Sequence, residues 1–86
     1  MPTLCYLFGL RVCMFMEKGF HHVPHLHLFL GDTKLATIAT NGEVLSGTIS
    51  NTEKKLVKDF IKIHKHELLV AWGRLQKGQL PNKIKV

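Results

Sequence analysis

The second half of the sequence carries one long helical pattern, and this pattern constrains the fold more than any other feature. Ser50, followed three residues later by Glu53, forms a capping box, in which each side chain satisfies a backbone N–H at a helix start. We expect the helix to run from about Asn51 to about Lys77, because Gly78 is a typical helix stop. Apolar residues recur on one broad stripe of this helix, which a sheet can bury. The stripe consists of Leu56, Val57, Phe60, Ile61, Leu68, Ala71, Trp72 and Leu75.

The first half of the sequence is typical of short strands separated by tight turns. Gly9-Leu10 and Gly31-Asp32 each separate two apolar runs, and Asn41-Gly42 is the strongest hairpin signal in the chain, because both residues tolerate positive φ. We therefore predict an α+β fold, with an antiparallel sheet of four or five strands covered on one face by one long C-terminal helix. The predicted strands are Thr3–Phe8, Arg11–Met16, His25–Leu30, Thr33–Thr40 and Glu43–Gly47.

The length of 86 residues leaves room for a single domain, spanning 1–86. We expect strands over about 3–47, the helix over about 51–77 and a basic tail over 79–86. Hydrophobic residues make up 45% of the chain, which is enough for a packed core. Twelve Lys and Arg against six Asp and Glu give a net charge of +6, which favours polyanions or an acidic protein partner. No apolar run is long enough for a membrane span, so we expect a cytoplasmic protein.

The two cysteines, Cys5 and Cys13, are expected to be reduced and mostly buried. If Gly9-Leu10 is a two-residue turn, Tyr6 faces Cys13 and Cys5 faces Met14, so the two thiols lie on opposite faces and cannot form a disulfide. No charged neighbour in the sequence would stabilise a thiolate, which favours a core role over a nucleophilic one.

Four of the six histidines lie within residues 21–27, and two of them share one face of a predicted strand. Alternate strand residues point to the same side. We call the side with His25 and His27 the histidine face, and the opposite side, with Leu26 and Leu28, the leucine face. The leucine face is more apolar, so we expect the helix to cover it and the histidine face to stay partly open. By the same alternation Phe29 belongs to the histidine face and Leu30 to the leucine face. Counting through two-residue turns adds Lys34, Ala36, Ile38, Glu43 and Leu45 to the histidine face, and Leu35, Thr37, Ala39 and Val44 to the leucine face.

Three interpretations of the histidines remain open. The first is a polar outer face without chemistry. The second is general acid–base catalysis by His25 and His27, with Glu43 tuning one of them, because imidazole titrates near neutral pH and RNA cleavage by the 2′-hydroxyl needs an acid and a base but no cofactor. The third is a metal site formed by His25 and His27, with His22 or His21 as a third ligand.

Lysines recur along one face of the predicted helix, opposite its apolar stripe. Lys55, Lys58, Lys62 and Lys65 follow the spacing i, i+3, i+7 and i+10. A charged run of this kind is usually a solvated helix face. Four lysines in a line can also follow a phosphate backbone, which gives affinity through counterion release but no base readout. The basic surface is extended by Arg74, Lys77, Lys83 and Lys85. His64 lies within the apolar stripe. Trp72 is either a packing anchor or a surface on which a base stacks.

Several segments together resemble a known family. They are Met1-Pro2-Thr3, Pro24-His25-Leu26-His27-Leu28, Gly31, Gly42-Glu43-Val44-Leu45-Ser46-Gly47, His66-Glu67-Leu68-Leu69 with Ala71-Trp72, and Pro81-Asn82-Lys83-Ile84. They resemble the small bacterial family of domains of unknown function that is marked by a Pro-His-x-His strand. The resemblance implies a bacterial cytoplasmic protein, encoded beside a second small protein as in toxin–antitoxin pairs. It carries His25 and His27 over as family positions, with Trp72 and Lys83 as weaker ones, and assigns nothing to His21 and His22.

The leading hypothesis is a small basic component, on the toxin side, of a toxin–antitoxin-like module that acts on RNA. The RNA backbone would be bound by Lys55, Lys58, Lys62 and Lys65, with Arg74 and Lys83 as further contacts. His25 and His27 would supply the acid and the base. The partner would be a cognate antitoxin-like protein. Such a ribonuclease would need no metal or other cofactor. The alternatives are a non-enzymatic module that binds DNA or an acidic protein, and a His-x-His metal-binding protein. An unpaired strand edge would also allow a homodimer.

Overall fold

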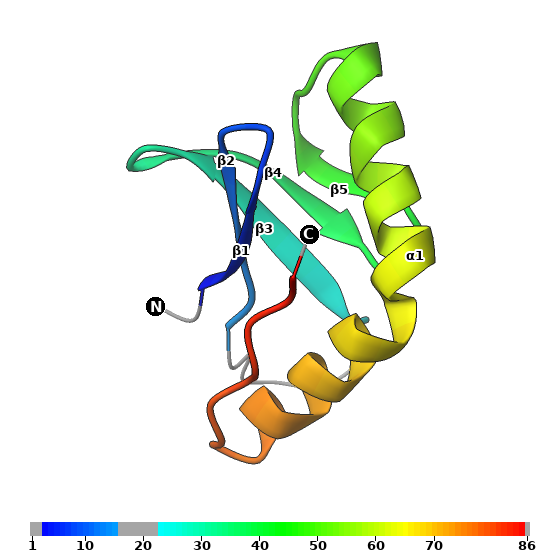
Figure 1. Cartoon of the computed structure of the whole chain (residues 1–86). Coiled ribbons are helices and arrows are strands. Elements are labelled where there is room, and N and C mark those ends of the chain that lie inside the picture. Colours follow the sequence, from blue (N-terminus) through cyan, green and yellow to red (C-terminus); the bar gives the residue numbers. More distant parts are fainter. Residues whose placement is uncertain (1–2, 16–22, 86) are drawn as a thin grey trace.

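The computed structural model describes residues 3–15 and 23–85, and in them five strands precede one helix (Figure 1). The strands form a single antiparallel sheet in which each strand pairs with the next along the chain. The predicted α+β class is therefore confirmed, and the sheet has five strands in its described part. The elements are β1 (Thr3–Leu7), β2 (Leu10–Cys13), β3 (His25–Leu30), β4 (Thr33–Ala39), β5 (Val44–Gly47) and α1 (Asn51–Gln76).

Both predicted ends of the helix are confirmed by their hydrogen bonds. At the start of α1, the Glu53 backbone N–H donates to Ser50 Oγ over 3.1 Å, and the Ser50 N–H donates to the Glu53 carboxylate over 3.0 Å. At the other end Gly78 has a φ of +77°, and its N–H donates to the Leu75 carbonyl. The Gln79 N–H donates to the Arg74 carbonyl. This pair of bonds is a Schellman motif, which a glycine at this position favours.

The helix bends near its middle, which the sequence pattern did not indicate. His64 has a φ of −107° and a ψ of 20°, outside the helical region, although neither proline nor glycine stands there. Figure 1 shows α1 changing direction, so that its second half runs across the end of the sheet near the start of β3. The His64 Nδ1 donates to the Glu67 carboxylate over 2.7 Å, and its ring packs 5.0 Å from that of Phe60.

The core forms between the leucine face and α1, as predicted. Leu26 and Leu28 are fully buried together with residues from both halves of the helix. The tail after α1 also contributes, since Ile84 is buried in the same core and its N–H donates to the Leu4 carbonyl over 2.9 Å. The helical residues in this core are Val57, Phe60, Ile61, Leu68, Ala71 and Leu75. Two predicted members of the stripe are less buried, because Leu56 is exposed and Trp72 is half-buried.

The first turn lies one residue earlier than predicted. Leu7 pairs with Leu10, so the turn consists of Phe8 and Gly9, which both have positive φ, as a two-residue hairpin of this kind requires. The predicted pairing of Tyr6 with Cys13 is therefore wrong, because Tyr6 pairs with Arg11. The two thiols nevertheless lie on opposite faces, as predicted, because Cys5 pairs with Val12 and Cys13 is the next residue along β2. Both cysteines are free and buried.

The predicted register of β4 is also wrong, and a β-bulge is the reason. The Gly31-Asp32 turn is confirmed by the pairing of Leu30 with Thr33, but Leu35 is an extra residue that shifts the pairing from there on. His27 consequently faces Thr37, and His25 faces Ala39. Ala36 and Ile38, predicted on the histidine face, belong to the leucine face, whereas Thr37 and Ala39 join the histidines.

The turn between β4 and β5 has three residues, Thr40, Asn41 and Gly42, instead of the two predicted. The Gly42 N–H donates to the Ala39 carbonyl, the Ala39 N–H donates to the Glu43 carbonyl, and Gly42 has a φ of +92°. A type I turn followed by a left-handed glycine is a common form of three-residue hairpin. It leaves Val44 paired with Ile38 on the leucine face, as predicted for Val44.

Candidate nucleic-acid interface

Three of the four lysines in the predicted row line one groove. Lys58, Lys62 and Lys65 project from α1 at a spacing of i, i+4 and i+7, which keeps them on one side of the helix. The opposite wall is the turn between β4 and β5, which packs against the helix. The groove has a volume of about 380 Å³ and is lined by Thr40, Asn41, Gly42, Lys58, Ile61, Lys62 and Lys65. We call it the lysine groove.

Gly42 allows the turn to approach the helix closely. A Cβ at this position would lie 3.2 Å from Cγ of Lys58, and Gly42 is itself buried. The turn thus packs against the aliphatic stem of Lys58, while the residue as a whole remains exposed, as is common for long basic side chains. The turn is the part of the site that the sequence could not indicate, since its contact with α1 is a tertiary one between positions 16 residues apart.

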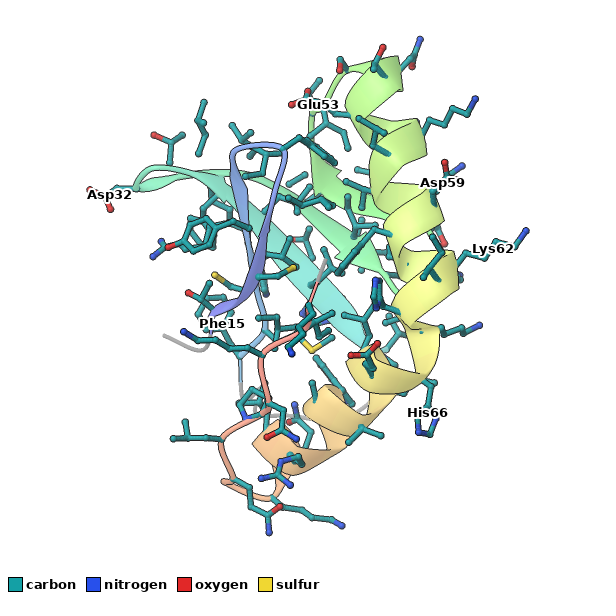
Figure 2. The ribbon with its side chains drawn as sticks, in the orientation of Figure 1. Phe15, Asp32, Glu53, Asp59, Lys62 and His66 are labelled. Carbon is teal, nitrogen blue, oxygen red and sulfur yellow. The ribbon has the colours of Figure 1, made fainter. Side chains whose placement is uncertain are left out.

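The lysine groove is electropositive. None of its lining residues is acidic. In the described part of the chain, no ion pair involves Lys58, Lys62 or Lys65, so their charges are not neutralised locally. Figure 2 shows the end of the Lys62 side chain extending from α1 into solvent. An adjoining hollow of about 490 Å³ shares Asn41, Gly42 and Lys58 with the groove and adds Lys54, but it also contains Glu43.

The remaining predicted basic residues do not join this groove. Lys55 is exposed on α1 but lies outside the lining of the groove. Arg74 holds the tail, because its Nε donates to the Leu80 carbonyl over 2.9 Å. Lys83 lines a separate hollow of about 190 Å³ between the second half of α1 and the tail, together with His66 and Glu67.

His25 and His27 lie together, as predicted, but in a closed environment. Their ring centroids are 5.1 Å apart, and each residue is only 8% exposed. Trp72, from the second half of α1, packs 5.0 Å from the His25 ring, and Phe15 packs 4.8 Å from the His27 ring. The histidine face is therefore closed at the two imidazoles. It is open at Tyr6, which lies on the same face because it pairs with Arg11 and Arg11 pairs with Phe29, and which is 66% exposed. Of the two roles considered for Trp72, packing is the one observed.

Hydrogen bonds orient both rings. The His25 Nδ1 lies 2.7 Å from the Val23 carbonyl, to which it donates, and the His27 Nδ1 lies 3.2 Å from the Thr37 hydroxyl. Glu43, predicted to tune one of the histidines, is exposed in the turn, where its backbone N–H donates to the Asn41 side chain. Within residues 3–15 and 23–85, the contacts of the two rings do not include Glu43.

The lysines and the histidines do not converge on one site. The lysine groove contains no histidine. Figure 2 shows Phe15, which contacts His27, on the opposite side of the molecule from Lys62. The predicted third metal ligand, His22, and its neighbour His21 lie outside the described residues. Among the residues that are described, no three His, Cys, Asp or Glu side chains are grouped closely enough to hold a metal ion.

Comparison with known proteins identifies a family without a known activity. The family described as "Domain of unknown function (DUF4160)" matches residues 9–73, which include β2 to β5 and most of α1. No significant match was found among curated proteins or among solved structures. No helix in the described part of the chain has the length and apolar character that crossing a membrane requires.

Proposed function

The chain belongs to the DUF4160 family, and we propose that it binds RNA through the backbone phosphates, with the lysine groove as the main contact. The observation that carries this proposal is that three unpaired lysines line a groove without any acidic residue. A cationic groove of this kind attracts a polyanion, and each phosphate that a lysine neutralises releases a counterion.

The type of residue in the groove determines what it can recognise. A lysine ammonium group is a compact point charge, unlike the planar fork of arginine that pairs with base edges. Contacts of this kind fix the position of a strand without reading its sequence. The proposed binding is therefore tight at low salt, weak at high salt and tolerant of sequence. Docking of an acidic protein with an apolar centre would depend far less on salt.

Charge reversal at one groove position tests the proposal. Lys62→Glu should weaken binding to a fluorescent oligouridine RNA by about tenfold at low salt, measured by fluorescence anisotropy. Lys55→Glu is the matched control, because it makes the same charge change on the same helix outside the groove. Equal losses in the two variants would mean that only net charge matters and that the groove is not the site.

A second candidate function is acid–base chemistry on RNA by His25 and His27. The observation in its favour is the contact between two imidazole rings, one of which is oriented by the Val23 carbonyl and the other by the Thr37 hydroxyl. Their low exposure and their separation from the lysine groove favour binding without cleavage as the first proposal. Incubation of labelled RNA with the wild type and with the His25→Ala/His27→Ala variant distinguishes the two, since cleavage by the wild type alone would support catalysis.

The proposed protein partner is a small antitoxin-like protein. The resemblance to the family with the Pro-His-x-His strand, whose members are commonly encoded beside a second small protein as in toxin–antitoxin pairs, supports a cognate small protein as the partner. Expression of the chain alone and together with the product of the neighbouring gene tests this. Growth arrest that the neighbour relieves is the expected result, and unaffected growth in both cases would remove the toxin role.

A further inference from the structure

A row of four side chains crosses the open part of the histidine face near the tips of the hairpins. Tyr6 of β1 pairs with Arg11 of β2, Arg11 pairs with Phe29 of β3, and Phe29 pairs with Lys34 of β4. Directly paired residues of an antiparallel sheet point to the same side. The row therefore alternates aromatic and basic side chains across four neighbouring strands. We call it the aromatic row.

The aromatic row is accessible, unlike the histidines two positions further along the strands. Tyr6 is 66% exposed, Lys34 is exposed, and Arg11 and Phe29 are half-buried. The helix packs into the core on the leucine face, and the exposure of Tyr6 and Lys34 shows that both ends of the row are open. Tyr6 lies beside Arg11, and Lys34 lies at the other end of the row beyond Phe29, so exposed aromatic and basic groups occur together on this part of the sheet. This combination fits a ligand with flat rings and negative charge.

The Arg11 guanidinium is held by a ring and not by an acid. Its Cζ lies 5.1 Å from the centroid of Phe29, within the range of a cation–π contact. The Arg11 Nε is buried and has no hydrogen-bond partner among the described residues. In the same residues no ion pair involves Arg11 or Lys34, and Asp32 projects from the hairpin tip (Figure 2). No carboxylate among the described residues thus neutralises the charge of the guanidinium, although its Nε is buried.

We propose that the aromatic row binds single-stranded nucleic acid by stacking an unpaired base on Tyr6 and contacting phosphates through Arg11 and Lys34. Aromatic side chains and arginine planes on an open sheet are suited to unstacked bases. A duplex hides its base faces, so this site selects single strands, whereas the lysine groove contacts any phosphate backbone. The inference goes beyond the proposed function, because it adds a second surface of different chemistry on the opposite side of the sheet.

The test compares single-stranded and duplex probes of the same length and sequence. Tyr6→Ala should weaken binding to a single-stranded oligoribonucleotide by about fivefold or more, as the loss of one stacked base does, and should leave binding to the duplex unchanged. Tyr6→Phe should restore the affinity, because the ring is kept. Ile63→Ala is the control, since Ile63 is 75% exposed on α1, away from the row. Urea unfolding verifies that the variants are folded.

The outcomes separate this inference from the proposed function. If Tyr6→Ala leaves single-strand binding unchanged, or weakens binding to both probes equally, the aromatic row is not a base-stacking site. If Lys62→Glu has no more effect than Lys55→Glu while Tyr6→Ala acts as expected, the groove proposal fails and the aromatic row stands.

Tyrosine fluorescence gives a direct measure of stacking. The chain has one tyrosine, Tyr6, and one tryptophan, Trp72. In a Trp72→Phe background, emission from Tyr6 should fall when saturating oligouridine is added, because a stacked base quenches it. Unchanged emission at saturation in the folded variant would overturn the proposed contact.

Discussion

The hydroxyl of Thr37 lies 3.2 Å from Nδ1 of His27, directly across β3 and β4. This contact exists only because the bulge at Leu35 moves Thr37 from the leucine face to the histidine face. It completes a row in which Thr3, Cys13, His27 and Thr37 face one another on successive strands. Both His27 and Thr37 are buried.

Removing this hydroxyl should destabilise the protein. Thr37→Val keeps the branched shape, so the expected loss of about 1 kcal/mol in the free energy of unfolding reflects the hydrogen bond. Thr33→Val, at the exposed start of the same strand, should change stability by less than about 0.5 kcal/mol. Urea denaturation measures both. Equal midpoints for Thr37→Val and the wild type would show that the contact does not stabilise the fold.

Gly47 at the end of β5 is expected to tolerate no side chain. Its φ is +83°, and a Cβ there would lie 2.7 Å from Cα of Ala36 and closer still to the Leu35 carbonyl oxygen. These are backbone atoms, so they cannot rotate away. Gly47→Ala should therefore cost at least about 2 kcal/mol of stability, from backbone strain and overlap together.

Gly73 provides the opposite control. It lies inside α1, and a Cβ there would meet nothing within 4 Å. Gly73→Ala should stabilise the helix by about 0.5–1 kcal/mol, because alanine loses less backbone entropy. Thermal melts of both variants distinguish them, and similar melting temperatures would contradict the geometry described for β5.

Because the Cys5 thiol is buried, we expect the free energy of unfolding to fall at alkaline pH. Burial, and to a lesser extent the nearby Cys13, raises the pKa of Cys5 from its ordinary value of 9.0 to about 11. The folded state thus disfavours the thiolate. The stability that the protonated Cys5 thiol contributes to the folded state is therefore fully present below pH 9. It falls as the pH rises toward 11 and is lost above that.

The measurement compares urea midpoints at pH 8 and pH 10.5 for the wild type and Cys5→Ala. The variant removes a buried group and is less stable at pH 8, but it should lose less stability than the wild type between the two pH values. The native thiol should also react slowly with iodoacetamide at pH 8. Parallel pH dependence in the two proteins would mean that another group governs the alkaline loss.

The sequence indicated the helix far better than the strand registers. The capping box of Ser50 and Glu53 and the glycine at position 78 are local signals, and both ends of α1 agree with them. The register of β4 depends on a bulge at Leu35, and the run Ala36 to Ala39 has small or apolar residues on both faces, so its alternation could not specify one pairing.

The candidate site could be predicted only in part, for a related reason. The helical period places Lys58, Lys62 and Lys65 on one side of the helix. The strand period places His25 and His27 on one face of the sheet. The wall formed by Asn41 and Gly42, the cover that Trp72 provides, and the alignment of Tyr6 with Phe29 depend on tertiary contacts or on register. No local pattern contains that information.

The salt dependence of RNA binding tests the central claim most directly. The variant Lys58→Gln/Lys62→Gln/Lys65→Gln removes the charges of the lysine groove, and Lys55→Gln/Lys77→Gln/Lys85→Gln removes as many from exposed positions outside it. For a single-stranded probe, the slope of log K against log salt should be shallower by about 2 in the groove variant than in the wild type. The control variant should keep nearly the slope of the wild type. A groove variant with the same slope and affinity as the control would contradict the account.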